Sequence, residues 1–253
     1  LNPLITCGHC DYCLDGRQNL CPERDLIGMY RPGAFAERIA IPRTNLIDIP
    51  LGMDAAAAAL TEPAATAVHA VNLAGRALAR SISEAKTLVI GGGSVGLFAA
   101  LALRDQGATE IMLADTNPLR RDVATRVGTA VVINPVDQPA PESYFNLVID
   151  AVGGRASRHA AIAAVAPGGV IMHIGLLDSD ESLDIRRITL QEITLIGTYT
   201  YTPVDLRATL AKLHSGAFGS LDWIDQRPLG DGPAAFQELH AGKCAAPKVI
   251  LRP

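Results

Sequence analysis

Residues 88–96 read Leu-Val-Ile-Gly-Gly-Gly-Ser-Val-Gly, and this stretch decides the fold. Its apolar start predicts a buried strand, its glycines repeat as Gly-x-Gly-x-x-Gly, and the apolar run that follows predicts a helix. Strand, glycine turn and helix bind a dinucleotide pyrophosphate, because glycines let the backbone turn tightly and approach the phosphates, while the helix N-terminus attracts the anion. The predicted phosphate contacts are Gly91, Gly93, Ser94, Val95 and Gly96.

An acidic residue follows the glycine turn at the spacing that a dinucleotide-binding site requires. A second apolar run, 110–114, ends at Asp115, about 20 residues after the glycine turn, where a carboxylate would bind the adenosine ribose. Thr116 and Asn117 follow and are predicted to bind the cofactor with Asp115, and Asn117 also reads as the N-cap of a helix. Arg120 could bind a 2′-phosphate or belong to a solvated helix face, so NAD is the expected cofactor and NADP the less expected one. The alternative, an α/β protein whose glycines serve packing only, explains fewer of these features.

Strands and helices alternate from residue 86 onward, which predicts an α/β fold with a doubly wound parallel sheet. The expected strands are 87–90, 110–114, 130–133, 147–150, 170–174 and 194–197. The expected helices between them are 96–104, 118–127, 156–165 and 186–191. Ligands bind at the carboxyl ends of such strands, so the predicted cofactor rim also includes Val152, Gly153, Ile174, Gly175, Leu176 and Thr198.

Four of the five cysteines form the pattern Cys7-x2-Cys10-x2-Cys13-x7-Cys21. Four thiolates at this spacing can surround a zinc ion tetrahedrally, and two disulfides or free thiols are the alternative. A cage of four protein ligands leaves no open position, so the expected zinc is structural and not catalytic. His9 lies within the lobe, but the cage is complete without it, and we expect it at the surface.

Composition excludes several classes of protein. The net charge is −4 and aromatic residues make up 4%, so no nucleic-acid surface is expected. No apolar run reaches the roughly 18 residues of a membrane span, and the first residues show no secretory signal. Clustered cysteines indicate a reducing compartment, so we expect a cytoplasmic protein without membrane partners.

The remaining segments are read from local signals. The alternating residues 33–42 predict a β-segment of a barrel-like domain. Asp54 is a plausible N-cap for a run at 55–60, after which Glu62-Pro63 interrupts and a helix resumes at 64–73. A helix at 203–216 and a strand at 248–251 are also expected.

Several motifs occur in the order found in one known family. These are the four-cysteine lobe, the Gly-Ala-Phe-Ala-Glu segment from residue 33, Glu62-Pro63, the glycine fingerprint, and the Ala-Pro-Gly-Gly turn from residue 166. In these motifs the sequence resembles the zinc-containing medium-chain alcohol and polyol dehydrogenases. The resemblance implies a partial GroES-like catalytic domain at 1–75 with the zinc lobe at 7–21, an inserted Rossmann domain at 76–204, and a return to the catalytic domain at 205–253.

The resemblance also implies chemistry. Members of the family pass a hydride from a secondary alcohol, polyol or sugar to NAD, aided by a catalytic zinc. Glu62 matches a zinc-ligating or zinc-facing carboxylate, although it could equally be a capping or ion-paired glutamate, and Thr66 matches a residue that faces the nicotinamide. His69 is left unassigned. The family pairs subunits through the sheet edge near residues 193–201, so a homodimer or homotetramer is expected.

One part of the family pattern is missing from the sequence. The family's other catalytic zinc ligands, a cysteine and the histidine of a Gly-His-Glu segment, lie upstream of the cysteine lobe, and this sequence holds neither. Two hypotheses follow. In the first the protein continues upstream and is a dehydrogenase of an unidentified alcohol. In the second it is a non-catalytic dinucleotide-binding remnant with a structural zinc lobe.

Overall fold

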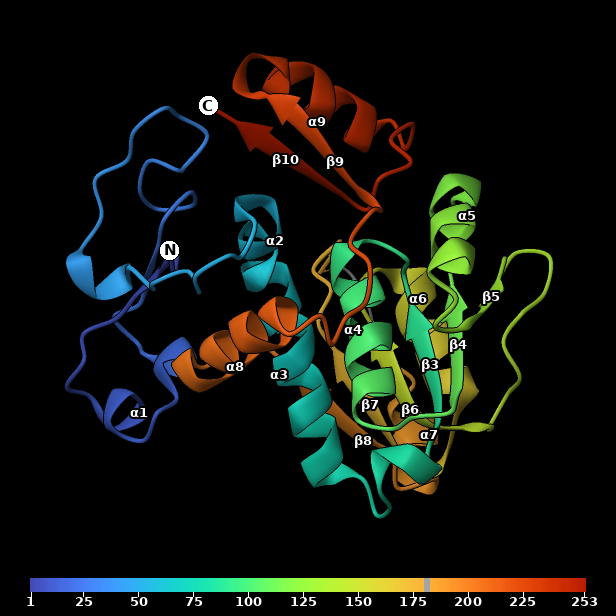
Figure 1. Cartoon of the computed structure of the whole chain (residues 1–253). Coiled ribbons are helices and arrows are strands. Elements are labelled where there is room, and N and C mark those ends of the chain that lie inside the picture. Colours follow the sequence, from blue (N-terminus) through green and yellow to red (C-terminus); the bar gives the residue numbers. More distant parts are fainter. Residues whose placement is uncertain (180–182) are drawn as a thin grey trace.

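The computed structural model describes residues 1–179 and 183–253 (Figure 1). Its centre is a six-stranded parallel sheet with the order β5-β4-β3-β6-β7-β8. The predicted doubly wound sheet is therefore confirmed, with all six strands in place. They are β3 (Lys86–Ile90), β4 (Glu110–Ala114), β5 (Val131–Ile133), β6 (Phe145–Asp150), β7 (Val165–His173) and β8 (Thr194–Gly197). Strand β7 begins at Val165, earlier than the predicted residue 170, and takes in the predicted Ala-Pro-Gly-Gly turn.

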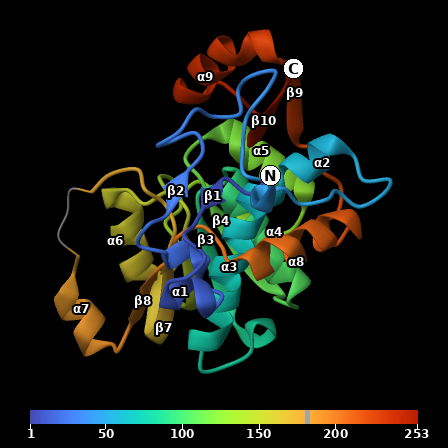
Figure 2. The same cartoon turned by 90° about the vertical axis from the view of Figure 1, so that its left-hand side faces the viewer.

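Helices cover both faces of the sheet, as Figure 2 shows from the side. Val89 and Leu113 pack on α4 (Ser94–Asp105) and α5 (Pro118–Val127), whereas Leu88 and Ile90 pack on α6 (Arg155–Ala164) and α7 (Ile185–Leu190). Neighbouring residues of β3 thus enter opposite cores, as the two-residue period of a strand requires. Because both faces are buried, the strand reads as a continuous apolar run in the sequence.

Helix α3 (Thr61–Ala77) links the sheet to the first part of the chain. It follows α2 (Ala55–Ala59), whose N-cap Asp54 accepts hydrogen bonds from the backbone N–H groups of Ala56 and Ala57, as predicted. The predicted interruption is present, but at Leu60 and not at Glu62-Pro63, which both lie in the first turn of α3. The backbone N–H groups of a first helical turn have no partner within the helix, so proline removes nothing there.

The predicted β-segment at 33–42 is also wrong. Among the described residues of the first part, strands form only at β1 (Leu4–Ile5) and β2 (Asp25–Leu26), which pair antiparallel. A strand is stable only beside a partner that takes up its backbone groups, and alternation in sequence supplies no partner. Phe35 instead remains 68% exposed and meets the ring of Phe236 edge to face, with 5.5 Å between ring centroids.

Three elements near the end of the chain form one unit, here called the C-terminal unit (residues 224–252). It comprises β9 (Ile224–Pro228), α9 (Gly232–His240) and β10 (Lys248–Arg252), and β9 and β10 pair in parallel. The strand expected at 248–251 is confirmed, while β9 and α9 were not predicted. In Figure 1 this unit stands above α2 and α5. Helix α8 (Pro203–His214) precedes it and packs on α3. Within the described ranges, no helix has both the length and the apolar character needed to cross a membrane.

Candidate functional site

The glycine turn stands where the chain order of the sheet reverses, between β3 and β6, which is where doubly wound sheets bind ligands. Gly91 has φ +101° and its N–H donates to the Ala114 carbonyl over 2.8 Å. Gly93 is the N-cap of α4 and caps it with no side chain. A Cβ at Gly96 would lie 1.8 Å from the Gly91 carbonyl oxygen, so helix and turn touch backbone to backbone. The free N–H groups of the first turn of α4 therefore open at this rim.

Asp115 closes the other side of the turn. It is 7% exposed, and its Oδ2 accepts a hydrogen bond from the Gly92 N–H over 2.6 Å. Its Oδ1 accepts from the Asn117 N–H over 2.7 Å. The Arg120 guanidinium lies 3.9 Å from Oδ2. The carboxylate is thus fixed by the backbone of both loops, and each oxygen still has a lone pair for a ribose hydroxyl.

The rest of the predicted rim is built around Asp150, which is fully buried at the end of β6. Its Oδ1 accepts hydrogen bonds from the backbone N–H groups of Val152 (3.0 Å) and Gly153 (2.8 Å), and its Oδ2 accepts from the Ser157 hydroxyl (3.0 Å). A Cβ at Gly153 would lie 1.9 Å from the Gly175 carbonyl oxygen, so the two turns are in direct contact. Asp150 was not among the predicted site residues, although an acid that ends an apolar strand shortly before two glycines is a visible signal.

Leu176 and Thr198, the two outermost residues of the predicted rim, differ in their exposure to solvent. Leu176, beyond Ile174 and Gly175, is 84% exposed. The N–H of Thr198 donates to the His173 carbonyl over 2.9 Å, while the Thr198 hydroxyl is buried without a hydrogen-bond partner among the described residues. That hydroxyl remains available to a ligand at the rim.

A pocket of about 540 Å³ adjoins the rim at the Asp115 end. Residues 134–144 connect β5 to β6 without a helix, and part of this loop forms one wall. Ala156, Ala160 and Ala163 of α6 form the opposite wall. The structure brings several predicted cofactor residues together in this lining, namely Gly91, Asp115, Thr116, Arg120 and Val152.

Glu62 is partly buried in the first turn of α3. Burial raises the pKa of its carboxyl group, and the charge of Lys248 and the hydroxyl of Tyr201 act in the opposite direction. Tyr201 is 1% exposed, and its hydroxyl makes no hydrogen bond of normal geometry with any described residue. Burial and the neighbouring Glu62 raise the pKa of Tyr201. The Thr66 hydroxyl, one helical turn further on, donates to the Glu62 carbonyl over 3.3 Å. Tyr201 and Lys248 could not be placed here from the sequence.

The described residues do not assemble a catalytic zinc site at Glu62. Their groups of three or more possible metal ligands are the four cysteines, and Cys7 with His9 and Glu23. A catalytic zinc needs three protein ligands and an open position. Glu62 therefore offers one carboxylate at most.

His69 belongs to a buried polar network between α3 and α8. Its Nδ1 donates to Asp205 Oδ2 over 2.8 Å, Asn72 donates to Asp205 Oδ1 over 2.9 Å, and the Thr202 hydroxyl also donates to Oδ2 over 2.6 Å. Burial alone would raise the pKa of Asp205, but these hydrogen bonds hold it well below its usual range. The network joins the helix that carries Glu62 to the helix that follows Tyr201.

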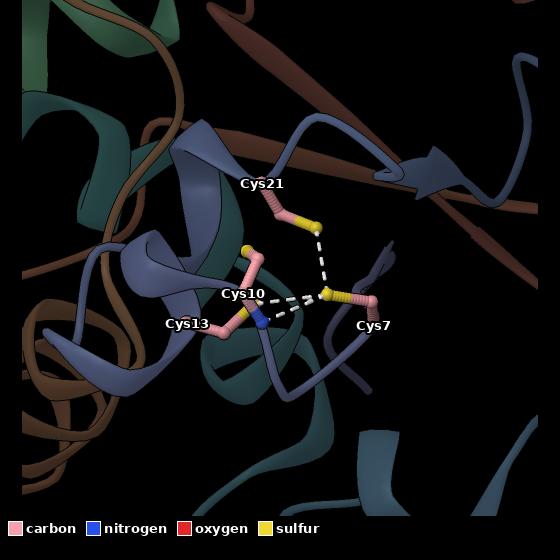
Figure 3. Close-up of side chains that lie close together, drawn as sticks. All are labelled: Cys7, Cys10, Cys13 and Cys21. Atoms are coloured by element: carbon pink, nitrogen blue, oxygen red, sulfur yellow. Dashed lines mark hydrogen bonds between the residues drawn. The ribbon is translucent and has the colours of Figure 1, made fainter.

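The four predicted zinc ligands point toward one another (Figure 3). Their sulfur atoms all lie within 4.8 Å of one another, with 3.6 Å between Cys7 and Cys21 and 3.9 Å between Cys7 and Cys13. Zinc with Zn–S bonds of about 2.3 Å places its sulfurs about 3.8 Å apart, whereas a disulfide needs about 2.05 Å. The four cysteines are free, so this geometry favours the zinc cage over disulfides.

The lobe around the cage is attached to the sheet, and its thiols differ in acidity. Backbone N–H groups of His9 and Cys10 lower the pKa of Cys7 to about 6, which favours the thiolate. A backbone hydrogen bond from Cys13 lowers the pKa of Cys10, but burial and the neighbouring cysteines outweigh it and raise that pKa to about 12. Asn19 donates to the Tyr199 carbonyl over 2.9 Å, and the Arg24 guanidinium lies 4.9 Å from the centre of the Tyr199 ring. His9 is exposed, as predicted. The lobe therefore rests on the loop that follows β8.

These features define a class of protein: a dinucleotide-dependent oxidoreductase with a structural zinc lobe. Comparison with known proteins gives the family. The family description "Zinc-binding dehydrogenase" matches residues 94–215, and "Alcohol dehydrogenase GroES-like domain" matches residues 1–51. The chain belongs to the zinc-containing medium-chain alcohol and polyol dehydrogenase family, and it is a hydride-transferring oxidoreductase that acts on CH–OH groups.

Two curated relatives illustrate the similarity. L-threonine 3-dehydrogenase of Yersinia pestis (strain Pestoides F) is 28% identical over 98% of this chain and 73% of its own length. L-galactonate-5-dehydrogenase of Escherichia coli (strain K12) is 31% identical over 80% of this chain and 60% of its own length. This chain therefore matches about three quarters of the first relative and less of the second.

Solved structures share the fold. L-idonate 5-dehydrogenase from Escherichia coli superposes with a TM-score of 0.88 at 25% identity, covering 99% of this chain and 74% of its own. Acetophenone reductase from Geotrichum candidum, solved with NAD, gives 0.87 at 25% identity over 98% and 71%. A zinc-binding dehydrogenase from Sinorhizobium meliloti, bound to NADP, gives 0.83 at 27% identity over 99% and 75%.

Proposed function

We propose that this protein oxidises a secondary alcohol in a small, carboxylate-bearing molecule and passes the hydride to NAD. The observation that carries the dinucleotide site is the contact between the glycine turn and Asp115, which fixes an acid beside the N-terminus of α4. The substrate class follows from the names of three relatives, which act on L-threonine, L-galactonate and L-idonate. Each of these molecules carries a secondary hydroxyl and a carboxylate.

Asp115 supports NAD over NADP. Its buried carboxylate would accept hydrogen bonds from the ribose hydroxyls and repel a 2′-phosphate. The Arg120 guanidinium would instead attract a 2′-phosphate, but it lies 3.9 Å from the Asp115 carboxylate and is attracted to that group. The phosphate-binding role of Gly91, Gly93 and the start of α4, and the cofactor role of the remaining rim residues, belong to this proposal.

Asp115→Ser should change the cofactor preference. We expect NADH to bind about tenfold more weakly and NADPH to bind more tightly, because a charged hydrogen-bond acceptor and its repulsion of phosphate are both lost. Calorimetric titration with both dinucleotides measures this. Asp122→Ser, which removes an exposed acid from α5, is the charge-matched control and should leave both affinities unchanged. An unaltered preference in the Asp115 variant would exclude NAD selection by this residue.

At the reaction end we place Glu62 and Thr66, with Tyr201 as a neighbour that orients Glu62. When bound, the nicotinamide accepts the hydride. The partly buried Glu62 carboxyl, with its raised pKa, can hold a proton closer to neutral pH than an exposed glutamate, and the buried Tyr201 lies beside it. As a zinc ligand Glu62 would act alone among the described residues, so we assign no step to a catalytic metal.

Turnover decides between an enzyme and a non-catalytic remnant. The full-length protein, loaded with zinc, should reduce NAD in the presence of at least one compound from a panel of L-threonine, L-galactonate and L-idonate. The measurement is NADH formation, with zinc content determined on the same sample. NADH binding without turnover on any secondary alcohol would favour the remnant.

The same proposal includes the domain division at 1–75, 76–204 and 205–253, and a cytoplasmic location. The division is supported by the self-contained sheet from Lys86 to Gly197, and the location by the four free thiols of the lobe.

We propose a dimer that pairs through β8. This strand ends the sheet, and Leu195 on it is 38% exposed. An apolar edge strand needs a cover, and a second copy provides one. Leu195→Lys should convert dimer to monomer in sedimentation velocity. Val131→Lys, on the opposite edge strand β5, is the control and should remain dimeric. A wild-type protein that sediments as a monomer would contradict the pairing.

A further inference from the structure

Asn117 uses both ends of its side-chain amide. Its Oδ1 accepts a hydrogen bond from the Leu119 N–H over 2.9 Å and so caps α5. Its Nδ2 donates over 2.9 Å to the carbonyl of Gly242, which lies 125 residues further along the chain. A single side chain thus begins one helix and reaches the C-terminal unit. Helix caps of this kind are common, whereas the hydrogen bond from Asn117 to Gly242 joins two separate parts of the molecule.

The acceptor of this second bond is held firmly. Gly242 has φ +66° and lies just after α9, where its N–H donates to the Leu239 carbonyl over 3.1 Å. A Cβ at position 242 would lie 3.4 Å from Asn117 Nδ2. The turn thus favours glycine for its backbone conformation, while an added Cβ would make only an ordinary contact with Asn117. The Gly242 carbonyl therefore belongs to a hydrogen-bonded turn with a defined backbone conformation.

On its other side Asn117 is tied to the dinucleotide rim. Its backbone N–H donates to Asp115 Oδ1 over 2.7 Å, so the residue that would bind the ribose and the residue that contacts the C-terminal unit move together. The C-terminal unit in turn reaches the reaction end, because Lys248 of β10 acts electrostatically on Glu62. Arg252 of the same strand lies 3.9 Å from Asp54 at the start of α2. The C-terminal unit therefore spans the distance between Asp115, the predicted ribose ligand, and Glu62.

We propose that Asn117 is a latch: its side-chain amide holds the C-terminal unit against the ribose-binding loop, so that dinucleotide binding and this contact stabilise each other. The inference rests on the proposed dinucleotide-binding function. Asn117 then acts as a positioning residue, not as a direct cofactor ligand. Coupling of this kind is reciprocal, so a bound dinucleotide must also protect the Gly242 turn.

Two variants separate the latch from the helix cap. Asn117→Ser keeps a good N-cap but is too short to reach Gly242, and Asn117→Asp keeps the cap and the shape but has no N–H to donate. Asn117→Ala removes cap and latch together. For each protein we would measure the dissociation constant of NADH, and the amide exchange of a peptide covering residues 240–248 with and without NADH.

The wild type should bind NADH and exchange residues 240–248 more slowly when NADH is present. The serine and aspartate variants should bind NADH about three- to tenfold more weakly, which corresponds to one hydrogen bond, and NADH should no longer slow this exchange. Serine is the neutral variant, so agreement between the two excludes an effect of charge. The alanine variant should lose thermal stability in addition, since the cap is gone.

The outcomes can be told apart. If both capping variants bind NADH like the wild type and are still protected by it at 240–248, the latch is excluded. If the wild type does not bind NADH at all, the proposed function fails, and with it the coupling. Faster exchange of 240–248 in the unliganded serine and aspartate variants would in that case still support the structural contact.

Discussion

Cys21→Ser should empty the zinc cage and release the first 25 residues from their native structure. Cys21 is fully buried, and its sulfur lies 3.6 Å from that of Cys7. The lobe has little regular structure of its own, with a four-residue helix at Asp11–Leu14 and a three-residue 3-10 helix at Gln18–Leu20. Structural zinc contributes about 10 kcal/mol or more to the folding of comparable small lobes, so this loss is the largest single effect that we expect.

Zinc per chain after dialysis against a weak chelator, together with tryptic cleavage at Arg17 and Arg24, measures this effect. We expect one zinc in the wild type, none in the variant, and rapid cleavage of the variant alone. Cys244→Ser is the matched control. It removes a buried thiol outside the cage, whose sulfur contacts the Ala246 carbonyl over 3.6 Å, and should keep the zinc. Full zinc retention by the Cys21 variant would show that the cluster is not the metal site.

Gly96→Ala should weaken dinucleotide binding strongly, by up to about 100-fold. The added Cβ would lie 1.8 Å from the Gly91 carbonyl oxygen and 2.9 Å from its carbon, both of them backbone atoms that cannot swing away. The start of α4 must then move off the glycine turn, which spoils the phosphate-binding geometry. Overpacking of this kind costs about 1–3 kcal/mol, so we expect up to about 100-fold weaker NADH binding and a lower melting temperature.

A second glycine of the same turn separates packing from phosphate contact. At Gly93 the nearest atom to an added Cβ is Arg120 Nη1 at 4.0 Å, so Gly93→Ala fits the unliganded protein. We expect it to keep the wild-type melting temperature and still weaken NADH binding, because the Cβ blocks the approach of phosphate. Gly230→Ala, with nothing within 4 Å, should change neither quantity. Wild-type NADH affinity in both fingerprint variants would place the dinucleotide elsewhere.

The bounds of several elements could be predicted to the residue because local chemistry sets them. Helix α5 begins after the Asn117 cap with Pro118 and ends at Gly128, whose φ is +69°. Strands β4 and β8 likewise match the predicted ranges. At the site, the glycine spacing and Asp115 were sufficient to locate the rim of the sheet, since both follow directly from the strand that precedes them.

The remaining features depend on contacts that sequence patterns do not carry. Tyr201 and Lys248 meet Glu62 from far along the chain, and the His69–Asp205 bond spans 136 residues. Residues 33–42 alternate like a strand but have no partner strand, and Pro63 fits in the first turn of α3 because the helices are interrupted earlier, at Leu60. Periodicity reports which face of an element is apolar, not which other element will lie against it.

The attachment of the cysteine lobe has a consequence for biosynthesis. The lobe rests on the loop after β8 through the Asn19–Tyr199 hydrogen bond, which joins residues 180 positions apart. A growing chain emerges from its N-terminus, so the ribosome completes the lobe long before it releases Tyr199, and a contact of such long range forms late. The cage needs only residues 7–21. Metal taken up during translation would therefore keep this early segment in its native shape until the surface that receives it has been made.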